Sequence, residues 1–166
     1  MNNWRIAASV GLIMLHFLLH VGLGLGPAAP DLATLGVLVL ARETGFVAGA
    51  VTGFVAGLLE DALNVLSFGS ATLALTLVGA AGARSRELFV GDSKLFVVAY
   101  IGLGKWGRDA VQWFATTEPL RDPPVSSLLV ESVIGALYLA WLALALRPLV
   151  RPATQSEARV AQGAAR

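Results

Sequence analysis

GFVAGAVTGFVAGLLEDALNVLSFG, residues 45–69, carries the strongest structural signal in this chain. Its glycines recur every four residues, at Gly45, Gly49, Gly53 and Gly57, so they lie along one slowly turning face of a helix. A face without side chains lets another helix approach closely, and in lipid this packing is a main drive for helix association. Two interpretations stay open, namely packing inside one bundle and docking of a partner's transmembrane helix.

The rest of the chain is also strongly apolar. Of its 166 residues 56% are hydrophobic and 14% are charged, and the mean hydropathy is +0.72, above the balance of a soluble domain. Only helices let an open chain cross lipid with every backbone group hydrogen-bonded. The sequence therefore predicts an all-α membrane protein, with one transmembrane domain at residues 1–149 and a flexible cytoplasmic tail at 150–166. Its helices correspond to six apolar stretches: 4–25, 28–41, 44–66, 70–83, 95–114 and 127–149.

Two of these stretches are short for a membrane span. A span needs about 20 residues, so the second and fourth stretches predict either tilted spans or half-spanning helices packed inside the bundle. Basic residues support the count of six, because cytoplasmic loops collect Lys and Arg. With both termini cytoplasmic, nine of the twelve basic residues lie inside and only Arg121 lies outside. Joining the second and third stretches would break this alternation at Arg42.

Two acidic residues, Glu60 and Asp61, end the glycine-rich helix near the predicted outer interface. A carboxylate there is either a hydrated helix end or an anchor. As an anchor it fixes the following loop, residues 64–69, or pairs with a basic residue of another span.

The fifth stretch contains charges at unusual depth, Lys105, Arg108 and Asp109. Such charges cost several kcal/mol in lipid unless they are paired or hydrated, so they normally face the bundle interior. Lys105 and Asp109 are four residues apart and can pair on one helix face. Glu131 of the sixth stretch lies at a depth similar to that of Arg108. We therefore predict an outer polar cluster of Arg108, Asp109 and Glu131, with Asp61 as a candidate fourth member, which acts as structural glue or as a pocket or partner site.

Several classes of site lack their signatures. The chain has no cysteine, so disulfides, thiolate zinc sites and cysteine nucleophiles are excluded. His16 and His20 can present two imidazoles on one helix face, but no further ligand motif accompanies them, and we expect no metal. No basic patch is interleaved with aromatic residues, so nucleic acid is not an expected partner. No catalytic or nucleotide-binding constellation is visible, so we expect neither enzymatic activity nor a cofactor.

Residues 28–86 combine a helix start, a short turn, the glycine repeat and the residues that follow it: Pro30, Asp31, Arg42, Gly45, Gly49, Gly53, Gly57, Asp61, Gly69, Leu75, Val78 and Gly79. In this pattern the chain resembles the rod shape-determining membrane protein MreD family. The span count and the chain length also agree with that family.

The resemblance implies a non-enzymatic scaffold of the bacterial elongasome in the inner membrane. Such a scaffold binds MreC and is linked to RodA, its transpeptidase and, indirectly, MreB filaments, supporting cell shape and peptidoglycan synthesis. Gly49, Gly53, Gly57, Asp61 and Gly69 are the motif positions that it assigns. MreD proteins resemble the substrate-binding subunits of energy-coupling-factor vitamin transporters, which implies a cavity, open to the outside, for a membrane lipid or a partner helix. The competing interpretation is such a vitamin-binding subunit. Short outside loops and the glycine pattern favour the scaffold.

Overall fold

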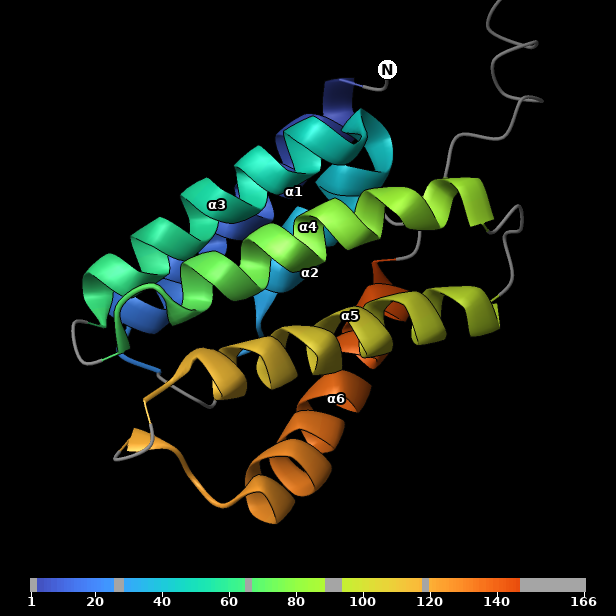
Figure 1. The fold of residues 1–166 in the computed structure, drawn as a ribbon. Helices are drawn as coiled ribbons and strands as arrows, with labels where there is room; N and C mark the ends of the chain where they lie inside the picture. The colour runs from blue at the N-terminus through green and yellow to red at the C-terminus, as the bar shows by residue number, and fades with distance from the viewer. Residues whose placement is uncertain (1–2, 26–28, 65–66, 89–93, 118–119, 147–166) are drawn as a thin grey trace, which may run out of the picture.

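The computed structural model describes residues 3–25, 29–64, 67–88, 94–117 and 120–146 (Figure 1). Over these ranges the chain forms helices and no strand, so the prediction of an all-α bundle is confirmed. The six α-helices are α1 (Asn3–Phe17), α2 (Leu32–Thr44), α3 (Phe46–Leu63), α4 (Ser70–Leu88), α5 (Lys94–Ala115) and α6 (Ser132–Ala145). Two π-helical segments, η1 (Leu18–Gly22) and η5 (Val125–Glu131), extend α1 and lead into α6.

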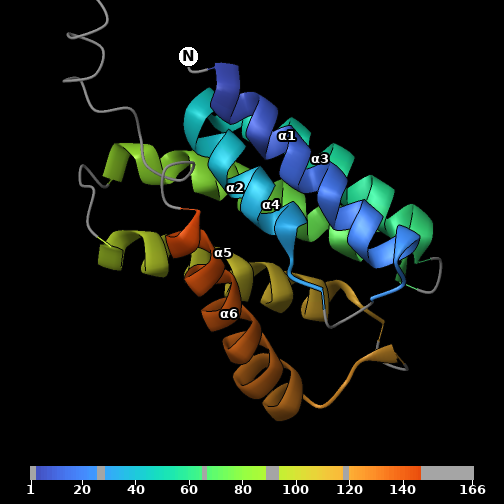
Figure 2. The same ribbon diagram turned by 180° about the vertical axis from the view of Figure 1, so that it is seen from behind.

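Successive helices run in opposite directions, so the bundle has two distinct ends (Figures 1 and 2). We call the end where α1 starts, α2 ends and α3 starts the N-terminal end. We call the opposite end the pocket end. The most extensive helix pair is α3 with α4, followed by α5 with α6 and α1 with α2.

The second helix, α2, is the centre of the bundle. It contacts α1, α3, α4 and α5, and every residue from Leu32 to Arg42 is buried. A helix that is apolar on all sides is stable only where other helices surround it. This short stretch is therefore a helix that other helices of the bundle enclose on all sides.

Local chemistry explains where the helices start and turn. The Asp31 carboxylate accepts a hydrogen bond from the Thr34 backbone N–H at 3.0 Å and caps the start of α2. Gly45 separates α2 from α3 with a φ of 98°, a conformation that side chains disfavour. Asp61, near the end of α3, accepts hydrogen bonds from the backbone N–H groups of Ala71 and Thr72 at 3.1 and 2.8 Å. It thereby satisfies the open amides at the start of α4.

The glycine repeat packs against α4 of the same chain. A Cβ placed on Gly53 would overlap the Leu75 carbonyl oxygen, and one on Gly57 would lie 2.5 Å from the Thr72 Cα. A Cβ on Gly49 would lie 2.7 Å from the Gly79 carbonyl oxygen. These three glycines therefore make the closest backbone approach of α3 to α4. The interpretation of this face as a docking groove for a partner helix is corrected, because α4 fills it, and Gly45 serves the turn instead.

Two helix limits differ from the sequence prediction. The fourth stretch was expected to end at residue 83, but α4 continues to Leu88 over 19 residues. Charged side chains end an apolar run without breaking a helix, so polarity alone placed this limit too early. The second helix starts at Leu32, after Pro30 and its Asp31 cap, and not at residue 28. The predicted end of the sixth stretch and the tail at 150–166 lie outside the described residues.

Three helices are long and apolar enough to cross a membrane: Asn3–Gly22, Phe46–Leu63 and Val125–Ala145. Their outward faces carry large apolar side chains; Val47 is 72% exposed and Trp141 is 67% exposed. Soluble monomers rarely expose contiguous apolar surface on this scale. The fifth helix is as long, with 22 residues, but it contains the charged residues that form the site described next.

Candidate functional site

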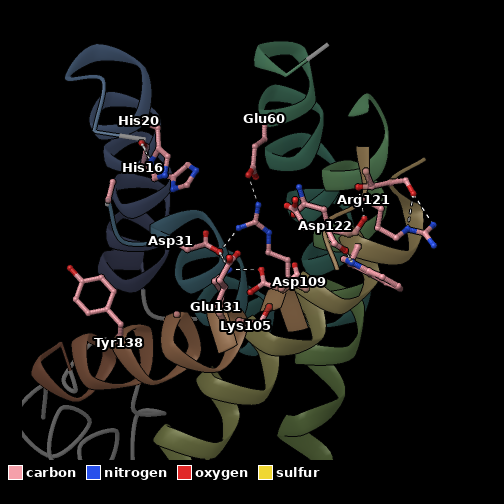
Figure 3. A pocket seen from close by; sticks show the side chains of 18 of the residues that line it. His16, His20, Asp31, Glu60, Lys105, Asp109, Arg121, Asp122, Glu131 and Tyr138 are labelled. Atoms are coloured by element: carbon pink, nitrogen blue, oxygen red, sulfur yellow. Dashed lines mark hydrogen bonds and ion pairs between the residues drawn. The ribbon is translucent and has the colours of Figure 1, made fainter. Parts of the chain in front are cut away.

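A pocket of about 410 Å³ opens at the pocket end of the bundle (Figure 3). Its walls come from the end of α1, the start of α2, the end of α3, the second half of α5 and the start of α6. The volume lies in the range of small-molecule sites, roughly 300–1,000 Å³. Figure 3 labels ten of the lining residues, which are charged side chains, two histidines and one tyrosine: His16, His20, Asp31, Glu60, Lys105, Asp109, Arg121, Asp122, Glu131 and Tyr138.

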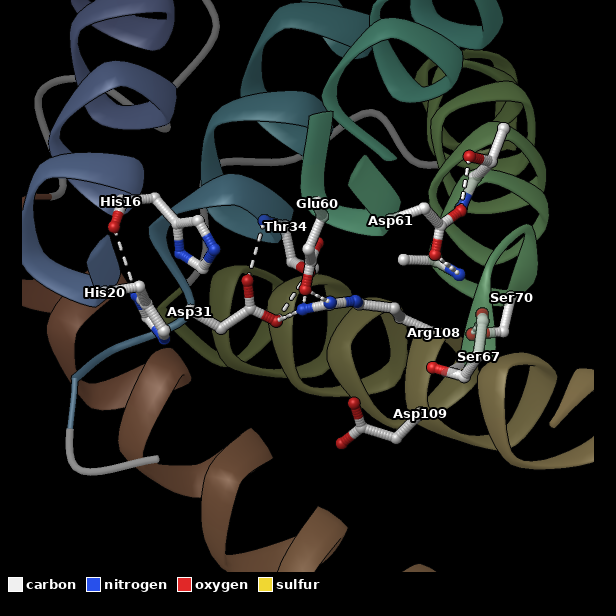
Figure 4. Close-up of polar contacts among 12 residues, drawn as sticks. His16, His20, Asp31, Thr34, Glu60, Asp61, Ser67, Ser70, Arg108 and Asp109 are labelled. Carbon is white, nitrogen blue, oxygen red and sulfur yellow. Dashed lines mark hydrogen bonds and ion pairs between the residues drawn. The ribbon is translucent and has the colours of Figure 1, made fainter. Parts of the chain in front are cut away.

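Arg108 is the centre of the ion-pair network beside this pocket (Figure 4). It is 5% exposed, and its two terminal nitrogens donate separately, one to Asp31 and the other to Glu60. The same guanidinium lies 3.3 Å from the Thr34 hydroxyl. One side chain of α5 thus holds the start of α2 to the end of α3. Buried charges of this kind are stable only when they are paired and hydrogen-bonded.

Lys105 lies one helical turn before Arg108 and contributes a second cation. It donates a hydrogen bond to Asp109, the partner that its spacing predicted. Its ammonium also lies 3.4 Å from the Asp31 carboxylate. Asp31 therefore faces two basic groups, and the network joins five charged side chains of three helices.

The partners of Arg108 differ from those predicted. Glu131 lines the same pocket but is exposed, and Asp31 and Glu60 make the ion pairs instead. Asp61 lies next to Glu60 but points to the start of α4, where its carboxylate bonds Ala71 and Thr72 (Figure 4). The neighbouring carboxylates thus have different roles: Glu60 pairs with Arg108, and Asp61 anchors the loop that leads to α4. Gly69, another motif position, has a φ of 96° just before α4 and allows the chain to turn.

His16 of α1 and His20 of η1 both line the pocket. Their ring centroids are 4.0 Å apart, and His20 Nδ1 lies 3.1 Å from the His16 carbonyl oxygen. His16 is 3% exposed and its Nδ1 has no hydrogen-bond partner within the described residues. Among all the residues that the structure describes, no group of three His, Asp or Glu residues is placed to hold a metal ion.

A second cavity, of about 560 Å³, is an apolar groove between α4 and α5. Leu38 of α2 and Val78 of α4 contribute to its lining. Six small residues also line the groove, three from α4 and three from α5: Ala81, Gly82, Ser85, Ala99, Gly104 and Gly107. The larger side chains of α5 in the lining are Leu95, Phe96, Tyr100 and Leu103. Its charge-free lining contrasts with that of the pocket.

No protein-family model, curated protein or solved structure matches this chain. The two cavities therefore rest on their own geometry. Sequence reasoning missed Trp113 and Tyr138 in the pocket and the small residues of the groove, since they follow no regular spacing. Asp31 was visible only as the start of a helix. Its place at the outer start of the second stretch was the one signal that could have placed it near Arg108.

Proposed function

We propose that this chain is a non-enzymatic scaffold of the bacterial inner membrane, of the MreD type, that binds the transmembrane helix of MreC in the groove between α4 and α5. The groove is the observation that carries the proposal. Six of its twelve lining residues are small residues of α4 and α5, and such residues let a third helix approach the backbone closely. Its lining is apolar, as a site for a single membrane helix must be.

Within the groove, Gly107 offers the most accessible backbone. A Cβ on Gly104 would lie 2.5 Å from a methyl group of Leu38, and one on Gly82 would lie 2.9 Å from another. These two glycines are therefore already covered by α2. A Cβ on Gly107 would meet no atom within 4 Å. The proposal assigns the contact with MreC to this open glycine and to Ala81 across the groove.

Charge supports the proposed orientation. Arg5 starts α1, Arg42 ends α2, and Arg84 lies in the last turns of α4, so all three belong to the N-terminal end. Basic residues favour the cytoplasmic side. The proposed topology has six spans with both termini in the cytoplasm, and the pocket then opens to the outside. In this arrangement the chain positions MreC between MreB filaments within the cell and RodA with its transpeptidase, which build peptidoglycan outside it.

A matched pair of glycine variants tests the groove. Gly107→Leu places a branched side chain in the groove, whereas Gly102→Leu places the same side chain on α5 outside the groove lining, and both positions have open space for a Cβ. Co-purification with MreC should fall about tenfold for Gly107→Leu, because overpacking an interface costs about 1–3 kcal/mol. Gly102→Leu should bind MreC as the wild type does.

Folding must be checked in parallel, by size-exclusion profile and circular dichroism in detergent. If Gly107→Leu is folded and captures as much MreC as Gly102→Leu, the groove is not the MreC site. If the wild type captures no MreC in either detergent or lipid nanodiscs, the scaffold proposal fails.

One observation favours a second candidate, the substrate-binding subunit of an energy-coupling-factor vitamin transporter. A polar pocket of about 410 Å³ at one end of a six-helix bundle is what such a subunit would use. This candidate requires an energising transmembrane partner and ATP-hydrolysing subunits. Affinity purification from native membranes separates the two, since it would recover those subunits in one case and MreC in the other.

A further inference from the structure

The pocket holds more negative charge than its own basic groups neutralise. Five carboxylates and three basic side chains line it, which leaves a net charge of −2 with both histidines neutral. Lys105 and Arg108 are engaged by Asp31, Glu60 and Asp109. These three carboxylates exceed their two basic partners by one charge, and Asp122 and Glu131 exceed Arg121 by one more.

The third basic group, Arg121, is hydrogen-bonded to the backbone and does not pair with Asp122 or Glu131. Arg121 donates to the carbonyl oxygens of Phe114 and Thr116, the shorter bond being 2.8 Å, and its guanidinium lies 4.5 Å from the Trp113 ring centroid. Within the described residues neither the Asp122 nor the Glu131 carboxylate makes an ion pair or a hydrogen bond. Both are exposed to the pocket opening.

Buried acceptor atoms in the pocket wall also lack partners. His16 is 97% buried, and its Nδ1 and the Glu60 Oε2 have no hydrogen bond within the described residues. Both residues line the pocket, and Figure 3 shows them on facing helices with Asp31 between them. Unsatisfied buried acceptors are costly, about 1–3 kcal/mol each. A group that brings several donors and a positive charge would remove this cost.

We infer that the pocket binds the protonated primary amine of a small molecule or of a lipid headgroup. An ammonium group has three donors and no acceptor, which matches free carboxylates beside unsatisfied acceptors. Tyr138 adds an aromatic face on the same wall, and such faces attract cations. An anionic ligand would find no basic group that is not already bonded, within the described lining. The inference does not depend on the MreC groove, which lies between other helix faces.

Three matched probes test the charge that the pocket selects: phenethylamine, 2-phenylethanol and phenylacetate. The full chain is placed in phosphatidylglycerol nanodiscs in phosphate buffer, so that neither lipid nor buffer supplies an amine, and binding is followed by ligand-observed NMR titration. Phenethylamine should bind saturably, and the neutral and anionic probes at least about tenfold more weakly, since hydrogen bonds to charged groups contribute about 1.5–3 kcal/mol.

The double variant Asp122→Asn with Glu131→Gln should weaken phenethylamine binding about tenfold or more. Both side chains are exposed and lack partners among the described residues, so the variant should fold, as circular dichroism will check. Glu43→Gln removes a carboxylate near the end of α2, at the N-terminal end of the bundle and outside the pocket lining, and serves as the control; it should leave binding unchanged. Equal loss in the control would show a bulk charge effect and overturn the inference.

A lipid arm identifies the source of the amine. Wild type and double variant are reconstituted with equal phosphatidylethanolamine and phosphatidylglycerol, and the retained lipid is measured by native mass spectrometry. Selective retention of phosphatidylethanolamine by the wild type assigns the site to a headgroup; soluble amine binding without it assigns the site to a free solute. Equal affinity for 2-phenylethanol and phenethylamine overturns the inference. The inference is also overturned if the protein neither binds the soluble amine nor selectively retains phosphatidylethanolamine.

Discussion

Replacing Arg108 by methionine should destabilise the bundle by about 3 kcal/mol. Breaking a buried ion pair typically costs about 3–5 kcal/mol, because the remaining charge loses its partner. Arg108 is 5% exposed and serves two carboxylates. Asp31 would keep Lys105 at 3.4 Å and the Thr34 N–H at 3.0 Å. Glu60 would lose its ion-pair partner, but its side chain is 23% exposed and can be partly hydrated, which places the cost at the lower end.

A double-mutant cycle measures how much of this loss belongs to Glu60. The free energy of unfolding is measured by SDS titration in bicelles for Arg108→Met, Glu60→Gln and the double variant. Because the two side chains touch, their coupling energy should be about 1–2 kcal/mol. The same cycle with Glu131→Gln should give a coupling below about 0.5 kcal/mol. A large coupling to Glu131 with none to Glu60 would refute the network described here.

Two further substitutions test the α3–α4 contact. Gly53→Ala should cost about 1–3 kcal/mol, because its Cβ would overlap the carbonyl oxygen of Leu75. The control Gly102→Ala should be neutral or slightly stabilising in the same titration, since alanine favours helices and has open space there. Asp61→Ala should cost about 2 kcal/mol by removing hydrogen bonds to the start of α4. Amide exchange at Ala71 should then accelerate; unchanged protection would contradict the anchoring role.

The helices themselves were predictable because the apolar stretches are separated by turns and charges. The residues at which the helices begin and end were less predictable. Polarity placed the end of the fourth helix at residue 83, yet Arg84 and the residues after it continue the helix. A helix ends where its backbone is capped or turned, as at Gly45. A change from apolar to charged side chains does not by itself end a helix. The central position of α2 could not be predicted, because length and hydropathy do not say which helices surround a stretch.

The site was predictable only where the contacts are local. Lys105 and Asp109 are four residues apart, so their pairing follows from helix geometry. The partners of Arg108 lie 77 and 48 residues away in the chain. The depth argument selects residues at one level of the bundle, but it does not say which way each helix faces. Glu131 was predicted at that level, but the packing of α2 at the centre brings Asp31 to Arg108 instead.

The same reasoning explains why the regular glycine repeat is not the proposed partner surface. A four-residue repeat of glycines marks a face that another helix can approach closely, and a helix of the same chain can fill that face before a partner does. In this chain α4 follows α3 directly and takes that face. A partner helix can use only the small residues that remain open after the chain has packed. Gly107 fits that condition, since a Cβ there would meet no atom within 4 Å and the residue lines the groove. A surface for a partner is therefore recognised by what internal packing leaves open, which the spacing of residues in the sequence does not reveal.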